Sequence, residues 1–351
     1  MSRAAGAIYP LPLTPEEITA DWLSAATGRA VRHAQVVDVI LGTSTKIRVS
    51  VDGDGLPPTL IVKGGFEDHS PSMKEMYANE IAFYGLLAPA LPIHAPRCWF
   101  AGSDPASHQS IVIMDDLVAR GVTFLHAQRP ETPAAVNRRL SDLARFHAAS
   151  WNDAGLAPGG RWDWVVGRFS DWSMVYAERY LKPEVWRHYC ESPRGAAIST
   201  RLHDADWMRR ALAHLAVIEQ SGARCIIHGD THLGNLYVEA DGTPGFLDAQ
   251  PARASPLMEV AYHVTGALDL ADRRACEQDL LRHYLTALAE CGVEPPPWEA
   301  AWLQYRQFIA YGLFIFLINE VRFQTEAINT AYAARFGAAM LDHDVMRLVG
   351  N

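Results

Sequence analysis

Residues 226–250 carry more information about this chain than any other stretch, and they read IIHGDTHLGNLYVEADGTPGFLDAQ. Asp230 and Asn235 stand five residues apart on a polar loop with an apolar segment on either side. Asp241-Gly242 is a turn signal, and Asp248 follows the next apolar segment. The pattern predicts short strands at residues 225–227, 236–238 and 245–247.

These residue types suit phosphoryl transfer to an alcohol. That reaction needs a carboxylate that orients the hydroxyl and takes its proton, and oxygen ligands that hold Mg²⁺ against the β- and γ-phosphates. Asp230 fits the first task, and Asn235 and Asp248 fit the second. Each residue alone also has an ordinary structural explanation, as a solvated loop aspartate, a turn asparagine or an aspartate at a strand end.

Two charged residues upstream complete the pattern. Lys63 ends the apolar segment 60–63, and Glu80 lies in a segment with helical spacing at residues 73–87. A lysine in this position can neutralise phosphate charge, and an ion pair with a helical glutamate would fix it. A surface lysine and an exposed glutamate are the alternatives, but the chain order of all these features favours the functional reading.

The rest of the chain changes character along its length. Strands are expected first, and a capping box at residues 14–17 predicts a helix that continues to about residue 27. From residue 133 the pattern is mainly helical, and the apolar stretch 308–318 predicts a buried helix. We expect an α+β fold with an N-lobe of antiparallel sheet plus helices at residues 1–116 and a helical C-lobe at 117–351. The expected early strands are 31–40, 45–51, 60–63 and 110–114.

Composition excludes several classes of protein. The chain has 351 residues and a formal net charge of −9, without a basic run, so no nucleic-acid partner is expected. Its five cysteines form no C-x-x-C pair, which argues against a disulfide framework or a structural zinc site and favours a cytoplasmic location. Neither a signal peptide nor a membrane-spanning stretch is expected. A monomer or a homodimer would suit this composition.

Segments spread over residues ~40 to ~270 together resemble the aminoglycoside phosphotransferase and choline kinase superfamily. The similarity is greatest to its ecdysteroid-kinase-like branch and the bacterial relatives of that branch. The segments are HGDTHLGN at 228–235, LDAQ at 247–250, NEIAFY at 79–84, MDDL at 114–117 and LARFHAAS at 143–150.

The resemblance implies a protein-kinase-like two-lobe fold, with ATP bound in the cleft. It implies that Asp230 is the catalytic base, that Asn235 and Asp248 bind Mg²⁺, and that Lys63 and Glu80 form an ion pair at the phosphates. The nucleotide-binding set further includes the loop residues Gly42, Thr43 and Ser44 and the adenine-binding hinge Met114, Asp115, Asp116 and Leu117.

Further residues are expected to support the loop that carries Asp230. Glu259 stands where the resembled relatives usually carry an aspartate that braces this loop. His228 is expected to shape the loop through backbone hydrogen bonds, and His232 either does the same or approaches a phosphate. His147 lies in an apolar helical pattern and is interpreted as a packing residue.

The sequence departs from the family pattern in the nucleotide loop. Residues 41–46 hold one glycine instead of a glycine-rich run, so the phosphate contacts must come from Ser/Thr groups and backbone amides. The metal motif reads Asp-Ala-Gln instead of Asp-Phe-Gly, a change that the resembled relatives tolerate.

We expect the acceptor to be an alcohol on a small molecule. Aromatic residues crowd residues 151–207, which favours an apolar or ring-containing acceptor over a polycationic sugar, with core packing as the alternative explanation. Other functions stay open: an aminoglycoside-type antibiotic phosphotransferase, a nucleotide-binding pseudokinase, a protein kinase, or a metal-dependent hydrolase built on His228, Asp230 and His232. The choice between ATP and GTP is also open.

Overall fold

The computed structural model describes residues 10–42 and 44–350, which form two compact units. The first unit comprises Met1–Thr123 and Tyr237–Gln250, and the second comprises Phe124–Leu236 and Pro251–Asn351. The first unit therefore extends beyond the expected lobe boundary at residue 116 and includes the later segment that carries Asp248. Backbone pairing explains the second difference, because the Phe246 N–H donates to the His94 carbonyl at 2.9 Å.

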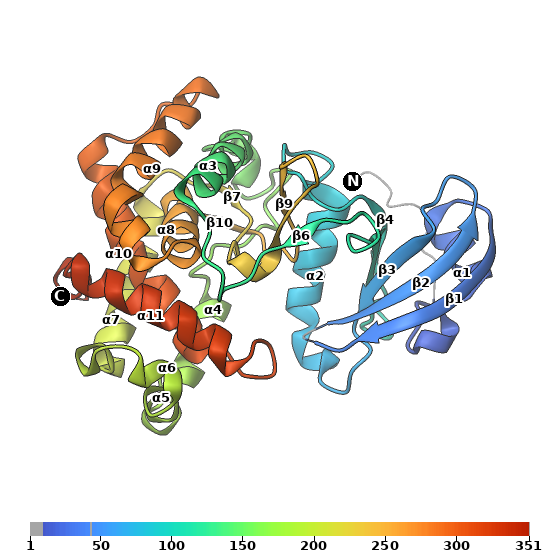
Figure 1. Cartoon of the computed structure of the whole chain (residues 1–351), viewed down its shortest axis with the longest axis horizontal. Helices are drawn as coiled ribbons and strands as arrows, with labels where there is room; N and C mark the ends of the chain where they lie inside the picture. The colour runs from blue at the N-terminus through green and yellow to red at the C-terminus, as the bar shows by residue number, and fades with distance from the viewer. Residues whose placement is uncertain (1–9, 43, 351) are drawn as a thin grey trace. The chain divides into compact units, whose positions relative to one another are not determined.

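An antiparallel sheet in the order β1-β2-β3-β5-β4 forms the first unit (Figure 1). Its strands are β1 Val31–Ile40, β2 Thr45–Gly53, β3 Thr59–Gly64, β4 Cys98–Ser103 and β5 Ser110–Asp115. The strands expected from the sequence form, whereas β4 was not expected. Its six residues are all half-buried, so they lack the alternation of apolar and polar positions that identifies a strand.

The two faces of this sheet pack against different helices. One face carries Ile47, Val62 and Ile113, which pack with Leu23 of α1 (Ala20–Thr27). Successive strand residues point to opposite faces. Lys63 therefore lies on the other face, toward α2 (Lys74–Ala82) and the π-helical turn η3 (Phe83–Leu87) that continues it.

The helix expected from residue 14 onward is interrupted. The capping box at Thr14 and Glu17 forms, but it begins only a short 3-10 helix, η1 (Pro15–Glu17). Ile18 leaves the helical conformation, and Thr19 caps α1 by accepting a hydrogen bond from the Trp22 N–H at 3.2 Å. The second cap explains the separate start of α1.

Short elements complete the first unit. The hairpin of β8 (Leu236–Val238) and β9 (Pro244–Phe246) places Asp248 just beyond its second strand. The 3-10 helix η2 (Ser70–Met73) precedes α2, and β6 (Thr123–Phe124) lies where the chain passes from one unit to the other.

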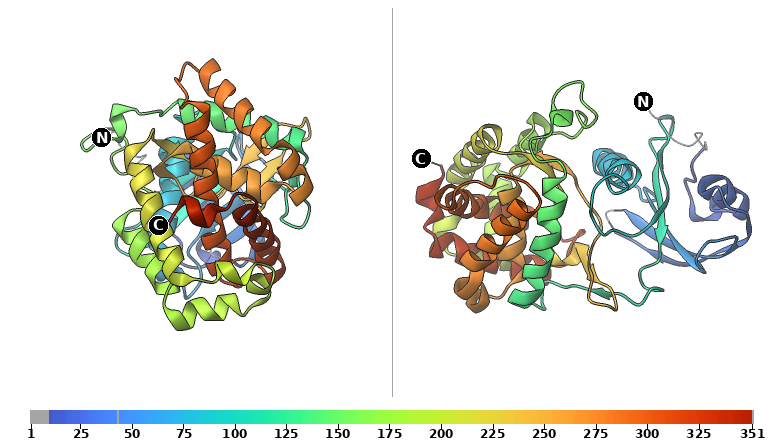
Figure 2. Two further views of the ribbon diagram at one scale, coloured as in Figure 1. Left: turned by 90° about the vertical axis from the view of Figure 1, so that its left-hand side faces the viewer. Right: turned by 90° about the horizontal axis from the view of Figure 1, so that it is seen from above.

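The second unit is mainly helical, and its C-terminal helices gather around α10 (Trp298–Ile318) (Figures 1 and 2). The expected buried helix at 308–318 is confirmed, since it forms the buried end of α10. The other helices are α3 Pro133–Ala148, α4 Asp171–Tyr180, α5 Pro183–Cys190, α6 Pro193–Ala196, α7 Ala205–Ser221, α8 Pro256–Ala267, α9 Leu270–Glu290, α11 Glu326–Asp342 and α12 Val345–Leu348, with 3-10 helices η4 Ala154–Leu156, η5 Thr200–Leu202 and η6 Leu233–Asn235. Among the described helices, none combines the length and apolar character that crossing a bilayer requires.

A small antiparallel pair of strands positions the Asp230 loop. β7 (Cys225–Ile227) pairs with β10 (Ala252–Ala254), residue Ile227 opposite Ala252. Residues 228–235, which we call the 228–235 loop, leave the end of β7, and α8 starts just after β10. The first turn of α8 is thus held close to the start of the loop.

Candidate active site

Charged residues of the first unit converge on Lys63. The buried Lys63 Nζ donates to Glu80 Oε1 at 2.5 Å and to Asp248 Oδ1 at 2.7 Å. The register of the sheet places Lys63 on the face that α2 covers, and Glu80 is a buried residue of that helix. The expected pair of Lys63 and Glu80 is therefore present, and Asp248 joins it.

This cluster keeps the lysine charged. Burial alone would lower the pKa of Lys63, but the carboxylates of Asp248 and Glu80 outweigh it and hold the pKa above its ordinary value. Asp248 is the more accessible partner, with 24% of its side chain exposed. Its backbone has φ of 55°, a conformation that few residues other than glycine adopt. The structure thus holds Asp248 in an uncommon conformation beside a permanent cation.

The expected hinge lies at the end of β5. Met114 and Leu117 are buried, and Leu117 packs with Tyr237 and Leu247 in a small apolar cluster. Asp116 is also buried and accepts hydrogen bonds from Arg48 Nε at 2.8 Å and from the Thr59 hydroxyl at 2.9 Å. The Asp116 side chain therefore braces this segment beside the buried apolar cluster.

The nucleotide loop is only partly described. Ser44 is buried, and Gly42 precedes it at the end of the β1–β2 connection. Thr43 lies outside the described residues. Thr45, which follows Ser44, donates from its hydroxyl to Glu67 Oε1 at 2.9 Å, and this bond fixes the start of β2.

In the second unit, both carboxylate oxygens of Asp230 accept hydrogen bonds. Asn235 Nδ2 donates to Oδ2 at 2.9 Å and to the Asp230 carbonyl at 3.0 Å. The Tyr262 hydroxyl donates to Oδ1 at 3.0 Å. The Asp230 side chain is nevertheless 31% exposed, so it remains accessible to a substrate hydroxyl. Because the Asn235 amide nitrogen faces Asp230, its oxygen is the atom left to bind a cation.

Glu259 braces the loop, as the resemblance implied. Its carboxylate accepts the backbone N–H of His228 at 2.9 Å and of Gly229 at 2.7 Å. His147 adds a hydrogen bond from Nε2 at 2.9 Å. Burial would raise the pKa of Glu259, but these donors outweigh it and hold the pKa below its ordinary value. Glu259 is therefore a buried carboxylate that stays charged.

The two loop histidines have different surroundings. His228 is fully buried, and its Nδ1 accepts the Asp230 N–H at 3.3 Å, a local bond that shapes the loop. His232 Nε2 lies 2.9 Å from Gln324 Nε2 and 3.5 Å from Asp230 Oδ2. Its ring also packs against Phe316 and Tyr332. His232 thus lies between Asp230 and the segment that joins α10 to α11.

The sequence analysis missed several residues around Asp230. Tyr262 stands three positions after Glu259, a spacing that puts both on one side of α8, so helical periodicity could have found it. His147 was interpreted as packing only. Arg168 carried no sequence signal; it is half-buried, and its guanidinium donates to the Gly229 carbonyl at 3.0 Å.

The aromatic segment divides into buried and accessible residues. Trp162, Trp186 and Trp207 are buried and belong to the core. Trp172 on α4 is 53% exposed and stacks on Tyr176 with ring centres 5.5 Å apart. Only part of the aromatic segment is thus available to a ligand.

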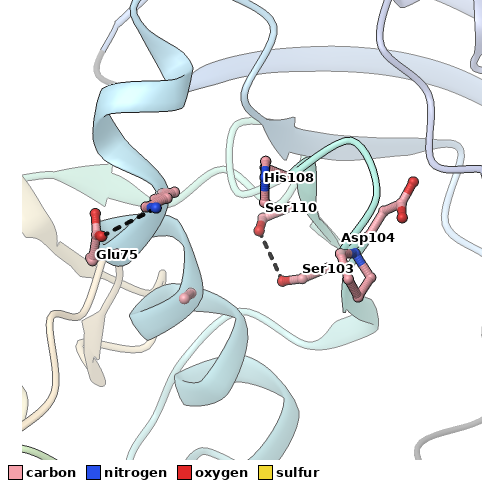
Figure 3. Close-up of a pocket in the computed structure, with 8 residues that line it drawn as sticks. Glu75, Ser103, Asp104, His108 and Ser110 are labelled. Carbon is pink, nitrogen blue, oxygen red and sulfur yellow. Dashed lines mark hydrogen bonds and ion pairs between the residues drawn. The ribbon is translucent and has the colours of Figure 1, made fainter.

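A separate pocket of about 300 Å³ in the first unit contains none of the expected site residues. Figure 3 shows Ser103 and Ser110 in its wall, their hydroxyls 2.8 Å apart. Its lining is Lys74, Glu75, Ala78, Ser103, Asp104, Pro105, His108 and Ser110.

Among the described residues, no group of three or more His, Cys, Asp or Glu side chains could hold a metal ion, so the hydrolase cluster of His228, Asp230 and His232 does not form.

The sequence matches the family model described as APH, phosphotransferase enzyme family, over residues 46–314. The chain belongs to this phosphotransferase family. The match covers more than half of the chain and confirms the resemblance at the level of the superfamily and the expectation of a phosphotransferase enzyme. The search of curated proteins found no match to the chain.

Solved structures of phosphotransferases and of a choline kinase share the fold of this chain. The GDP and kanamycin complex of APH(2")-IIia aligns with a TM-score of 0.53 at 12% identity, covering 89% of this chain and 94% of that one. Choline kinase from Cryptosporidium parvum Iowa II aligns with a TM-score of 0.51 at 13% identity, covering 90% and 91%. Macrolide 2'-phosphotransferase MphH from Brachybacterium faecium aligns with a TM-score of 0.50 at 17% identity, covering 90% and 97%. The expected protein-kinase-like α+β fold of the phosphotransferase is confirmed.

Proposed function

We propose that this phosphotransferase transfers the γ-phosphate of ATP to a hydroxyl group of a small apolar or ring-containing molecule. The observation that carries the proposal is the contact of the buried Lys63 with both Glu80 and Asp248. It joins a permanent cation, suited to phosphate oxygens, to a carboxylate suited to a metal ion.

The residues fit a magnesium nucleotide by the chemistry of their donor atoms. The Asp248 carboxylate and the Asn235 amide oxygen are hard oxygen ligands, which Mg²⁺ prefers over nitrogen or sulfur. Bound by them, Mg²⁺ would neutralise charge on the β- and γ-phosphates. Lys63 would contact the α- and β-phosphates, with Glu80 holding its ammonium. Adenine would pack on the hinge cluster beside Leu117, with Gly42, Thr43 and Ser44 covering the phosphates.

Asp230 would act on the acceptor. Its carboxylate would accept a hydrogen bond from the acceptor hydroxyl, orient the oxygen for in-line attack and take the proton as the new P–O bond forms. Asn235 and Tyr262 fix the carboxylate, so little reorganisation is needed when the hydroxyl arrives. His228, His232 and Glu259 would act by holding the loop.

The accessible aromatic residues support a ring-containing acceptor. Trp172 and Tyr176 stack on α4, and the Tyr176 hydroxyl lies 2.9 Å from that of Tyr180. The Tyr180 hydroxyl donates to Glu320 Oε1 at 2.9 Å, in the same connection between α10 and α11 that brings Gln324 to His232. A flat apolar surface is thereby linked to the Asp230 loop within one unit.

Two variants and a panel of alcohols test the proposal. We expect ADP release with at least one ring-containing alcohol, and Asp230→Ala should nearly abolish turnover while ATP still binds. Asp248→Ala should lose the magnesium-dependent part of nucleotide binding. Full activity of Asp230→Ala, or unchanged magnesium dependence of Asp248→Ala, would contradict the assignments. GTP and an aminoglycoside belong in the panel, because they separate an antibiotic-type phosphotransferase from the proposed one.

A further inference from the structure

Two lysines stand directly opposite each other on the sheet of the first unit. Lys46 in β2 and Lys63 in β3 are Cα partners in the antiparallel register. Their neighbours Ile47 and Val62 are fully buried on the face toward α1, so both lysines point to the opposite face. Like charges directly opposite each other repel, and such a pair needs an anion to stabilise it.

Asp248 supplies that anion. Its Oδ1 accepts from Lys63 Nζ at 2.7 Å, and its Oδ2 lies 3.7 Å from Lys46 Nζ. The two lysines differ in accessibility, with side-chain exposures of 5% for Lys63 and 37% for Lys46. Lys63 also has Glu80 as a permanent partner, whereas Lys46 has the more distant and more accessible contact.

We propose that Lys46 is a second phosphate-binding cation, which rests on Asp248 and moves to the phosphates when a nucleoside triphosphate binds. The inference rests on the proposed function and deepens it. A divalent cation on Asp248 would displace the ammonium of Lys46, since like charges repel, and the triphosphate is the anion that receives it. Little free energy is lost when a flexible, half-exposed lysine exchanges one ion-pair partner for another.

This assignment also accounts for the sparse nucleotide loop. Residues 41–46 hold a single glycine, so the loop has few positions where a backbone amide can approach a phosphate closely. Lys46 lies two residues after Ser44, and the Thr45 bond to Glu67 fixes the backbone at this point. A side-chain cation can replace the contacts that a glycine-rich backbone would make.

The test compares Lys46→Met with Lys46→Arg by isothermal titration of the whole protein. The ligands are a non-hydrolysable ATP analogue with Mg²⁺, adenosine, and Mg²⁺ alone. Lys46→Met should lower the affinity for the triphosphate analogue by about tenfold or more. The affinity for adenosine should stay unchanged. The variant should bind Mg²⁺ alone more tightly than wild type does, because Asp248 has lost a competing cation. Lys46→Arg keeps the charge and should stay close to wild type.

Lys74→Met is the matched control. Lys74 is an exposed lysine of the same unit with one weak ion pair, to Glu75 at 3.9 Å, and its removal should change none of the three affinities. Wild-type triphosphate affinity in Lys46→Met, or an equal loss for adenosine, overturns the inference while the proposed function stands. A wild-type protein that binds no nucleotide overturns both.

Discussion

Both oxygens of the Asp230 carboxylate are held by neighbours within one unit. Asn235 holds Oδ2 and Tyr262 holds Oδ1, at 2.9 and 3.0 Å. A carboxylate held from both sides keeps one rotamer, and the remaining lone pairs then point in fixed directions. The value of Tyr262 therefore lies in the orientation of Asp230 more than in the stability of the fold.

Tyr262→Phe removes that single hydroxyl without removing the ring. We expect kcat to fall by about 10- to 100-fold, because a loosened Asp230 is misaligned with the acceptor. The KM for ATP should stay unchanged, since Tyr262 has no role toward the nucleotide. Steady-state kinetics with the best alcohol of the panel measures both constants.

Tyr305→Phe is the control for this change. Its hydroxyl is equally buried and donates to Glu277 Oε2 at 3.2 Å, away from the Asp230 loop. It should lower stability and leave kcat intact. A Tyr262→Phe enzyme with wild-type kcat would remove Tyr262 from its positioning role.

At the scale of elements, helix α8 organises the 228–235 loop. Glu259 binds the backbone of His228 and Gly229, Tyr262 binds Asp230, and His263 Nδ1 lies 3.0 Å from the Thr231 carbonyl. The spacing i, i+3, i+4 puts these three side chains on one face of the helix. One rigid helix thus fixes four consecutive loop residues.

Glu259→Gln should disrupt this bracing. The substituted amide offers one acceptor oxygen and one NH₂ group, which cannot accept the N–H that faces it, and the charge that His147 contacts is lost. Breaking such a buried charged arrangement costs about 3 kcal/mol. Urea unfolding should show this loss, together with a lower kcat in the folded enzyme.

Glu259→Asp keeps the negative charge on a shorter side chain and serves as the comparison. It should lose less stability than Glu259→Gln and recover part of the activity. If Glu259→Gln is as stable as wild type, the carboxylate is not what holds the loop.

The local sequence pattern was enough to predict much of this arrangement. It was not enough to predict the register in which the strands pair. The strand at 31–40 and the loop residues Asp230 and Asn235 follow from alternation and turn signals. Lys46 was not singled out, because its position opposite Lys63 depends on how β2 and β3 pair. Asp248 was expected in the C-lobe but packs in the first unit, a consequence of hairpin packing that no local pattern records.

For the molecule as a whole, buried titratable groups around the loop set the response to acid. Burial and the nearby Arg139 lower the pKa of His263 to about 3, although the Thr231 carbonyl and Glu259 act against the shift. Since the Thr231 carbonyl can only accept, Nδ1 carries the proton of the neutral ring. Nε2 then has no hydrogen-bond partner among the described residues, so a second proton there would be a buried, unpaired charge.

The sign of the effect follows from comparing the folded and unfolded states. The unfolded chain binds a proton at His263 near its ordinary pKa of 6.5, whereas the folded chain does so only near 3. Between these values the unfolded state holds more protons, so stability falls as the pH falls below about 6.5. Glu259, whose pKa is lowered, keeps its contribution above about 4.5 and loses it only as the pH drops through its folded pKa. The two groups therefore act in different pH windows.

His263→Gln isolates the upper window, because a glutamine can still donate to the Thr231 carbonyl but does not titrate. Wild type should lose about 2 kcal/mol between pH 6.5 and pH 5.0 through this histidine alone, and the variant should lose correspondingly less. Urea unfolding at both pH values measures the difference, and His33→Gln, on an exposed position of β1, should keep the wild-type pH dependence. A His263→Gln protein whose stability falls as steeply as that of wild type over this interval would mean that the acid sensitivity arises elsewhere in the fold.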